Sequence, residues 1–165
     1  MNGSGSDRGV HWSGRVATST WIALAIAAMG AGGLTYVLYR PTSLTMFGWF
    51  GAIGLDPIVE SMRRQSEAWS WRPPAWWIGS APAALWLLSG LCAFTAIWKG
   101  CDPRGARLWL AAVVAAGLGG EAGQAIGFVP GTFDAIDLGA SLLAIAFFAW
   151  MTLPRRRAAI PEPST

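Results

Sequence analysis

Two polar residues lie in a stretch that is otherwise apolar or glycine, and their side chains could bind a cation or move a proton. Glu121 and Gln124 lie between residues 108 and 128, a stretch as long as a membrane-spanning helix. A charged side chain there costs at least about 2.5–3.5 kcal/mol on insertion scales, so one that persists is a candidate for function. Asp134 and Asp137 follow shortly afterwards. We predict that these four residues form one polar site, with Glu121 at its chemical centre.

These side-chain types suit two kinds of chemistry. Carboxylates and amides are hard oxygen ligands that favour Mg²⁺ or Ca²⁺ over zinc, so Glu121, Asp134 and Asp137 are candidate metal ligands. A carboxyl group tuned by burial can also act as a general acid or base, and Glu121 and Asp137 are the candidates for that catalytic role. Ser141, about one helical turn beyond Asp137, completes the polar cluster with Gln124. No organic cofactor is expected.

Structural roles are open for the same residues. Asp134 could cap a helix that starts after it, and Asp137 would then lie in the first turn, where the helix dipole stabilises a carboxylate. Gln124 could bridge two helices by hydrogen bonds. Glu121 could be paired with an arginine from the edge of the membrane.

Composition indicates the class of protein to which this cluster belongs. The chain is 53% hydrophobic and 13% charged, with a mean hydropathy of +0.41, whereas a soluble domain carries about 25% charged residues. Four segments of about 19–21 residues are long enough to cross a bilayer as helices: 21–39, 78–98, 108–128 and 135–153. Helices satisfy their own backbone in lipid. We therefore predict an all-α fold, a bundle of four transmembrane helices forming a single domain over residues 20–153.

The basic residues predict the orientation of this bundle. Of the 12 lysines and arginines, eight lie in the N-terminal tail 1–19, in the loop after the second span, and in the C-terminal tail 154–165. The other four are Arg40 and the arginines of the long loop 41–77. Because positive charge accumulates on the cytoplasmic side, we predict a multi-pass protein of the bacterial cytoplasmic membrane with both termini in the cytoplasm.

That orientation places the polar cluster near the extracytoplasmic face. Glu121 lies about 20 Å along its helix from Leu108 at 1.5 Å per residue, which is in the outer half of the membrane. The turn Pro130-Gly131 then leads back to Asp134 on the same side. The cluster is thus expected between the third and fourth spans, beside the outer boundary.

Glycines at four-residue spacing form a stripe on the third predicted span: Gly119, Gly123 and Gly127. Such spacing lets another helix approach closely. We expect the stripe to support packing within the bundle or a homo-oligomer.

The loop 41–77 carries further apolar features. Residues 44–55 are too few to span and suit an interfacial or re-entrant piece. Asp56-Pro57 predicts a helix start, with the aspartate as N-cap, and the helix that follows has an apolar face for the outer membrane surface. The tryptophans from Trp69 to Trp77 predict an aromatic belt. A cleaved signal peptide over residues 20–32 is the alternative for the first span, but the apolar run continues to Leu38 and favours a span.

The sequence around the polar cluster resembles a known family. Glu121-Ala122-Gly123-Gln124, followed by a Pro-Gly-Thr turn and Asp134-x-x-Asp137, is similar to the pattern at the last transmembrane helix of the VanZ-like family of small bacterial membrane proteins. Ser80–Trp86 also looks like the Ser-x-Pro-x-x-Leu-Trp opening of a span in related proteins. The resemblance covers residues 80–150. Thr132 stands where many members have Arg, and Ser141 or a neighbouring residue stands where many have Asn.

The resemblance implies a cell-envelope protein and names no reaction, although the family's namesake is associated with low-level resistance to a glycopeptide antibiotic. We favour a non-catalytic protein whose carboxylate cluster binds a cation or the headgroup of an envelope lipid or lipid-linked precursor. The first alternative is an enzyme acting on a lipid-linked envelope substrate, with Glu121 or Asp137 as general acid or base. The second is a proton-coupled carrier that uses Glu121 as a relay.

Other chemistry has little support in the sequence. The single histidine, His11, lies in the N-terminal tail, far from any serine or cysteine of the spans. Cys92 and Cys101 do not suggest a disulfide framework and are expected to be unreactive. The basic tails are expected to set topology, and no nucleic-acid partner is predicted.

Overall fold

The computed structural model describes residues 16–129 and 133–153, and this part of the chain is entirely helical. Its helices are α1 (Thr18–Tyr39), α2 (Thr45–Ala52), α3 (Asp56–Glu67), α4 (Ala75–Trp98), α5 (Pro103–Ala125) and α6 (Ala135–Thr152). The predicted all-α fold is therefore confirmed for the described residues. Most of the N-terminal tail, the turn at residues 130–132 and the C-terminal tail with its arginines lie outside them.

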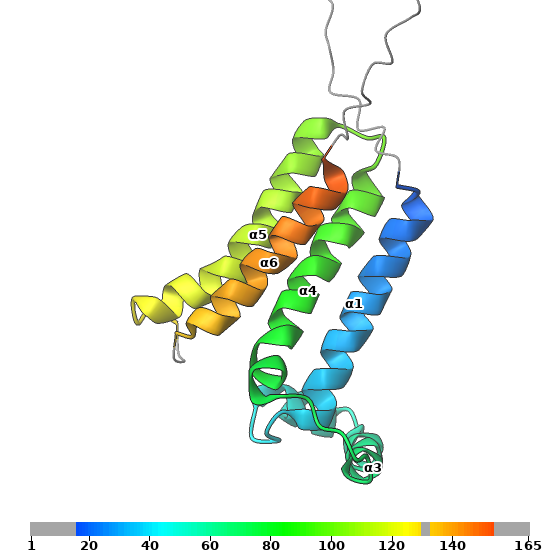
Figure 1. Ribbon diagram of the computed structural model, residues 1–165, viewed down its shortest axis with the longest axis vertical. Coiled ribbons are helices and arrows are strands. Elements are labelled where there is room, and N and C mark those ends of the chain that lie inside the picture. The colour runs from blue at the N-terminus through cyan, green and yellow to red at the C-terminus, as the bar shows by residue number, and fades with distance from the viewer. Residues whose placement is uncertain (1–15, 130–132, 154–165) are drawn as a thin grey trace, which may run out of the picture.

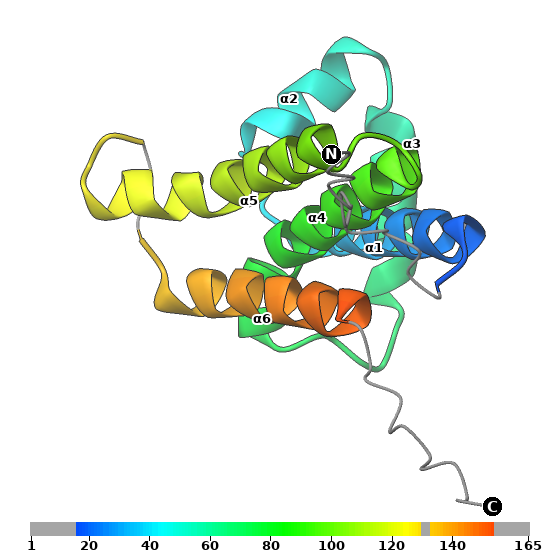
Figure 2. The same cartoon turned by 90° about the horizontal axis from the view of Figure 1, so that it is seen from above.

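The four long helices run side by side, with α4 in the middle (Figures 1 and 2). α4 packs against α1, α5 and α6, whereas α5 and α6 make few contacts with each other. α1 and α5 run in one direction and α4 and α6 in the other (Figure 1). The start of α1 and the end of α6 therefore share one end of the bundle, which we call the terminal end. α2, α3 and the connection from α5 to α6 lie at the other, the loop end.

Three of these helices, α1, α4 and α6, are long and apolar enough to cross a membrane by length and composition. Their bounds agree with the predicted spans to within three residues. α5 is equally long but does not reach the same hydropathy, because its glycines, Glu121 and Gln124 dilute the apolar residues. Length and composition therefore support three of the four predicted spans.

The start of α5 differs from the predicted start of the third span at Leu108. The helix begins at Pro103, because Asp102 caps it: its carboxylate accepts hydrogen bonds from the backbone N–H groups of Arg104, at 3.1 Å, and Gly105, at 2.9 Å. Proline is well suited to a first helical turn, where its missing N–H is not needed. The apolar run alone could not indicate this polar first turn.

The end of α5 also differs, since the helix stops at Ala125 and not at Phe128. Gly127 has φ +73°, a left-handed conformation that favours glycine. The N–H of Phe128 bonds to the Gly123 carbonyl at 2.8 Å and that of Gly127 to the Gln124 carbonyl at 3.1 Å, which is a Schellman motif. The prediction treated the apolar residues after Gln124 as helix, whereas they form the cap.

Small residues allow α1 and α4 to lie close together. On α1, Ala25, Ala28 and Gly32 form a buried stripe. A Cβ atom added to Gly32 would lie 2.8 Å from Nε1 of Trp86 on α4. The hydroxyl of Ser89 on α4 donates to the Ala25 carbonyl at 2.8 Å. Close backbone approach and an interhelical hydrogen bond are the usual means of packing helices in lipid, where apolar contact adds no hydrophobic drive.

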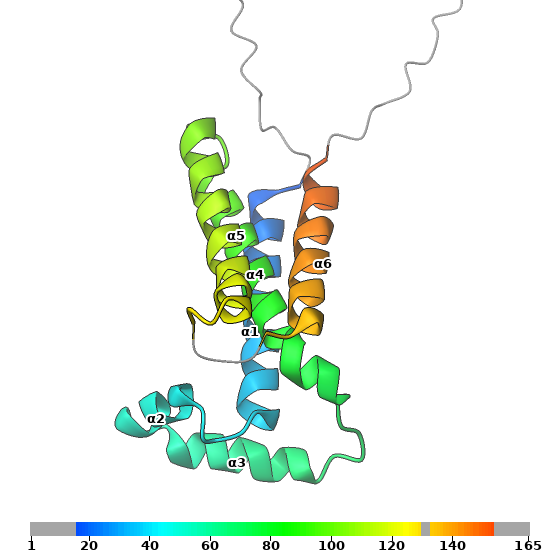
Figure 3. The same ribbon diagram turned by 90° about the vertical axis from the view of Figure 1, so that its left-hand side faces the viewer.

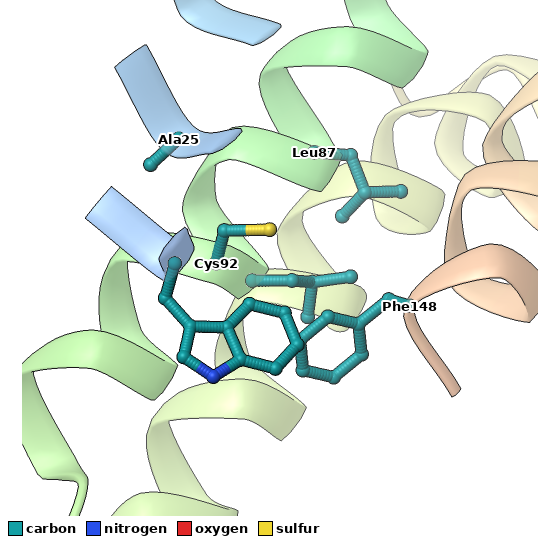
Figure 4. Close-up of a cluster of buried hydrophobic side chains, with 6 residues drawn as sticks. Ala25, Leu87, Cys92 and Phe148 are labelled. Carbon is teal, nitrogen blue, oxygen red and sulfur yellow. The ribbon is translucent and has the colours of Figure 1, made fainter. Parts of the chain in front are cut away.

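The apolar core lies toward the terminal end and joins three helices (Figure 4). It consists of Trp21, Ala25, Leu87, Leu91, Cys92 and Phe148. The rings of Trp21 on α1 and Phe148 on α6 lie 5.6 Å apart between centroids. Cys92 is completely buried in this core, whereas Cys101 is exposed, and both thiols are free.

At the loop end, α3 runs across the bundle (Figure 3). Arg63 connects α3 to the end of α1. Its Nη1 donates hydrogen bonds to the carbonyls of Val37, at 2.8 Å, and Arg40, at 2.9 Å. The guanidinium also lies over the ring of Phe47 on α2, 5.7 Å from its centroid. One side chain therefore ties α3 to both α1 and α2.

The predicted N-cap of α3 is wrong by one residue. Asp56 is the first residue of the helix, and Leu55 occupies the N-cap position without a side-chain bond. The reason lies in Gly54, whose φ of +76° turns the chain so that Leu55 already has helical dihedral angles. On α3, Val59 and Ser66 are buried, and Ile58, a residue of the apolar face expected at the membrane surface, is 57% exposed.

Candidate functional site

Within the part of the chain that the structure describes, Asp137 is the residue of the predicted cluster whose side chain is hydrogen-bonded to another helix. It lies in the first turn of α6, and its Oδ1 accepts a hydrogen bond from the hydroxyl of Ser80 on α4. Ser80 is only 2% exposed. The bond joins residues 57 positions apart and fixes the start of α6 against α4. Ser80 was noted in the sequence only as part of the family resemblance, because nothing in an apolar span shows which distant residue a serine will meet.

Asp134 is the N-cap of α6. Its Oδ1 accepts a hydrogen bond from the backbone N–H of Ile136 at 2.8 Å, and the residue is exposed. The helix-cap alternative is therefore confirmed for Asp134. The cap explains why α6 begins at Ala135, and the bond uses one of the two oxygens of this carboxylate.

Glu121 lies on the face of α5 that packs against α4. One turn earlier, a Cβ atom added to Gly117 would lie 2.8 Å from Cδ1 of Leu87 on α4, so this face is in close contact. Residues four apart share a helix face, which places Glu121 on the same side. Its Oε2 atom is buried and has no hydrogen-bond partner among the described residues.

A nearby arginine does not account for this buried oxygen. The ion pair found in the described ranges joins Arg64 and Glu60 on α3, at 3.4 Å, and both side chains are well exposed. Arg40, at the end of α1, lies over the ring of Tyr36 at 5.9 Å from its centroid, and its own Nε is buried without a partner in the described chain. Pairing of Glu121 with an arginine is thus not found within residues 16–129 and 133–153.

Gln124 and Ser141 lie on the two helices that meet at this connection. Gln124 is partly buried in the last turn of α5, where its backbone carbonyl belongs to the helix cap. Ser141 is 3% exposed and lies one turn beyond Asp137 on α6. No hydrogen bond between described residues joins either side chain to Glu121, so it stays a prediction that the four residues and Ser141 form one site.

The glycine stripe has a different use from the one predicted. A Cβ atom added to Gly123 would lie 2.5 Å from Cγ2 of Val129, in the turn after α5, and Gly127 is part of the helix cap. Gly119 has open space around it among the described residues. The close approach to another helix is made by Gly117 instead. A role of the stripe in a homo-oligomer stays a prediction.

The predicted metal ligands do not form a coordination group in the described chain. Among residues 16–129 and 133–153, no three His, Cys, Asp or Glu side chains come together in a way that could hold a metal ion. Asp134 caps a helix at the surface, Asp137 is bonded to α4, and Glu121 lies on α5. Their role as metal ligands, and that of Glu121 and Asp137 in catalysis, stay predictions.

The fold and the site together are those of a helical bundle with three helices long and apolar enough to span a membrane, and with a partly buried glutamate whose Oε2 has no hydrogen-bond partner among the described residues. Comparison with known proteins gives no matching family model, no matching curated protein and no matching solved structure. The likeness to the VanZ-like family therefore stays an expectation from the sequence.

Proposed function

We propose that the chain is a four-span protein of the bacterial cytoplasmic membrane, with α5 as the third span. α4 and α6 run in the same direction (Figure 1), so the chain between them must return across the same thickness. α5 makes that return, and its 23 residues measure about 34 Å at 1.5 Å per residue. A hydrocarbon core of about 30 Å would be covered.

Within this proposal, both termini are cytoplasmic and α3 lies on the outer surface. The count over the whole sequence supports this orientation: eight basic residues lie in the two tails and around the connection from α4 to α5, and four lie from Arg40 to Arg72. α3 crosses the bundle axis as an interfacial helix would (Figure 3), and Ile58 and Trp69 are free to enter lipid, at 57% and 56% exposure.

Native Cys101 makes this topology testable. The exposed thiol belongs to the terminal end, while Gln65 is an exposed position on α3. In intact cells, a membrane-impermeant maleimide should leave wild-type Cys101 unlabelled and should label Gln65→Cys in a Cys101→Ser background. Labelling of Cys101 alone would show that the orientation is opposite to the proposed one. Labelling of both thiols would show that Cys101 and α3 lie on the same side of the membrane.

The proposed activity is binding of a cation by the carboxylate of Glu121. The cation is either the ammonium headgroup of an envelope lipid, which donates a hydrogen bond to the carboxylate, or an inorganic cation that the carboxylate coordinates. The supporting observation is the buried Oε2 without a described partner. A buried carboxylate is costly unless a charge or hydrogen bond compensates it, and a ligand at the membrane boundary would supply both. Binding is favoured over acid–base catalysis by Asp137, because the carboxylate of Asp137 is already bonded to Ser80.

The test compares lipids that differ in their ability to donate hydrogen bonds. Full-length protein is released from nanodiscs of phosphatidylethanolamine, phosphatidylglycerol and phosphatidylcholine, and native mass spectrometry identifies the retained lipid. Wild type should retain phosphatidylethanolamine over phosphatidylcholine, whose quaternary ammonium cannot donate. Glu121→Gln should weaken retention at least about tenfold, since a hydrogen bond to a charged group contributes about 1.5–3 kcal/mol.

The matched control is Glu67→Gln, the same change at an exposed carboxylate on α3, which should retain lipid like wild type. A second arm titrates Mg²⁺ and Ca²⁺ by calorimetry in phosphatidylcholine nanodiscs. Loss of metal binding in Glu121→Gln alone would identify an inorganic cation as the ligand. If Glu121→Gln changes neither lipid retention nor metal binding, the binding proposal is wrong.

A further inference from the structure

A small apolar pocket lies at the terminal end of the bundle, opposite the end that holds Glu121. All four long helices contribute to its lining: Trp21 from α1, Thr95 and Trp98 from α4, Ala106 and Leu110 from α5, and Met151 from α6. Lys99 and Cys101, in the connection from α4 to α5, line it as well. The pocket thus combines an apolar interior with one ammonium group.

The depth of this pocket matches the headgroup level of a bilayer. Its lining comes from the first turn of α1, the last turns of α4 and α6 and the first two turns of α5, where the apolar segments end. Trp21 and Trp98 are of the residue type that gathers at membrane–water boundaries. A phospholipid beside the bundle would present its phosphate and the start of its acyl chains at this level.

The charges at the pocket favour an anion. Nζ of Lys99 donates to the Val16 carbonyl at 2.5 Å, and an ammonium has further donors. No carboxylate in the described chain pairs with it. Arg107 lies next to the pocket, with Nε 3.1 Å from the carbonyl of Pro103, a lining residue. The local carboxylate, Asp102, is occupied by the backbone N–H groups that it caps.

We propose that this pocket binds an anionic phospholipid, with the phosphate at Lys99 and the start of one acyl chain against Trp98, Leu110 and Met151. Charge complementarity and an apolar interior at headgroup depth select this occupant. A zwitterionic lipid would satisfy the apolar lining but would bring its own cation toward Lys99. The site is separate from the proposed Glu121 site, which lies at the other end of the bundle and takes a cation.

Cys101 is a built-in reporter for this proposal, because it lines the pocket and is exposed, whereas Cys92 is completely buried. Full-length protein is placed in phosphatidylcholine nanodiscs with increasing shares of phosphatidylglycerol. The rate of labelling by N-ethylmaleimide, an uncharged reagent that membrane surface charge does not attract, is measured. When about nine-tenths of the sites are occupied, the rate should have fallen about tenfold, since only the unoccupied fraction reacts.

Two variants test the charge and the space independently. Lys99→Gln should abolish protection by phosphatidylglycerol and Lys99→Arg should restore it, which separates the charge from the tether to Val16. Ala106→Leu fills the pocket without changing charge and should also abolish the lipid dependence. Arg64→Gln, at the loop end, is the control and should behave like wild type. Cys101→Ser should show no labelling.

Protection by pure phosphatidylcholine equal to that by phosphatidylglycerol would overturn the proposal. So would protection that survives both Lys99→Gln and Ala106→Leu. If thermal unfolding shows that Lys99→Gln does not fold, Lys99→Arg and Ala106→Leu are compared instead. Retained protection in Lys99→Arg together with lost protection in Ala106→Leu supports the site. Any other result contradicts it.

Discussion

At the terminal end, charged side chains are held by the backbone, whereas at the loop end buried atoms of two charged side chains have no hydrogen-bond partner among the described residues. Lys99 donates to the Val16 carbonyl, and Asp102 accepts from the start of α5. At the other end, Oε2 of Glu121 and Nε of Arg40 are buried with no hydrogen bond to the described residues.

This contrast separates charges that build the fold from charges that are open to a ligand. Leaving a buried polar group unsatisfied costs about 1–3 kcal/mol, and more when it is charged. At the terminal end, helix caps and hydrogen bonds to the backbone account for the positions of the charged side chains without a partner molecule, apart from the remaining N–H donors of Lys99. They explain Asp134 and Arg63 at the loop end as well, but not Glu121. Substitutions at these positions measure whether each charge stabilises the fold.

The largest effect is expected at Arg63, the structural charge of the loop end. Arg63→Ala removes two charge-assisted hydrogen bonds to the end of α1 and should lower the free energy of unfolding by about 2–3 kcal/mol. Arg64→Ala is the matched control, because its partner Glu60 is exposed and such pairs contribute about 0.3–0.5 kcal/mol. Denaturant unfolding in micelles measures both, and equal effects would mean that Arg63 does not fasten α3.

A smaller loss is expected at Ser80. Ser80→Ala removes the bond between α4 and α6 and should cost about 0.6–2 kcal/mol, the range from double-mutant cycles to model peptides for interhelical hydrogen bonds in membranes. Asp137→Asn should cost less, because an amide oxygen still accepts from the hydroxyl. A double-mutant cycle with Asp137→Ala gives the coupling. Strict additivity would show that the bond does not stabilise the bundle.

Replacing Glu121 should raise the stability of the protein, whereas the two preceding substitutions should lower it. If it is kept for a ligand, Glu121→Leu should raise the free energy of unfolding of the ligand-free protein by about 1 kcal/mol, because an unsatisfied buried group is removed. Glu67→Leu, at an exposed carboxylate, should leave it unchanged. Lower stability of Glu121→Leu in the same micelles would mean that Glu121 is bonded within the protein and that the contrast between the two ends is lost.

The smallest effect is expected at Asp102 and depends on pH. The backbone N–H groups of Arg104 and Gly105 hold the pKa of Asp102 below its ordinary value of 3.8. A lowered pKa in the folded state means that the carboxylate stabilises the cap above about pH 4 and that this contribution is lost as the pH falls further. Asp102→Asn still caps the helix and should lack this dependence. Thermal midpoints of the two proteins should therefore converge on acidification, and a constant difference would contradict the role of the charge.

The sequence allowed a good prediction of the elements and a poorer one of their ends. Long apolar runs identified α1, α4 and α6 closely, because a span needs a minimum length. The bounds of α5 and the N-cap of α3 were wrong. The end of α5 and the start of α3 depend on turn geometry at Gly127 and Gly54, and the start of α5 depends on the Asp102 cap, none of which an apolar run encodes. Asp134 was correctly recognised as a possible cap because capping is local.

The sequence alone was enough to predict the class of structure: an all-α fold, confirmed for the described residues, with long apolar helices and with carboxylates near one connection. These follow from composition and short-range rules. Three features are known only from the tertiary structure. Ser80 donates a hydrogen bond to Asp137, Arg63 donates to carbonyls at the end of α1, and Oε2 of Glu121 is buried without a hydrogen-bond partner in the described chain. The physical reason is that a hydrogen bond between distant residues depends on how helices pack, and packing sets which buried groups are satisfied and which are left for a ligand.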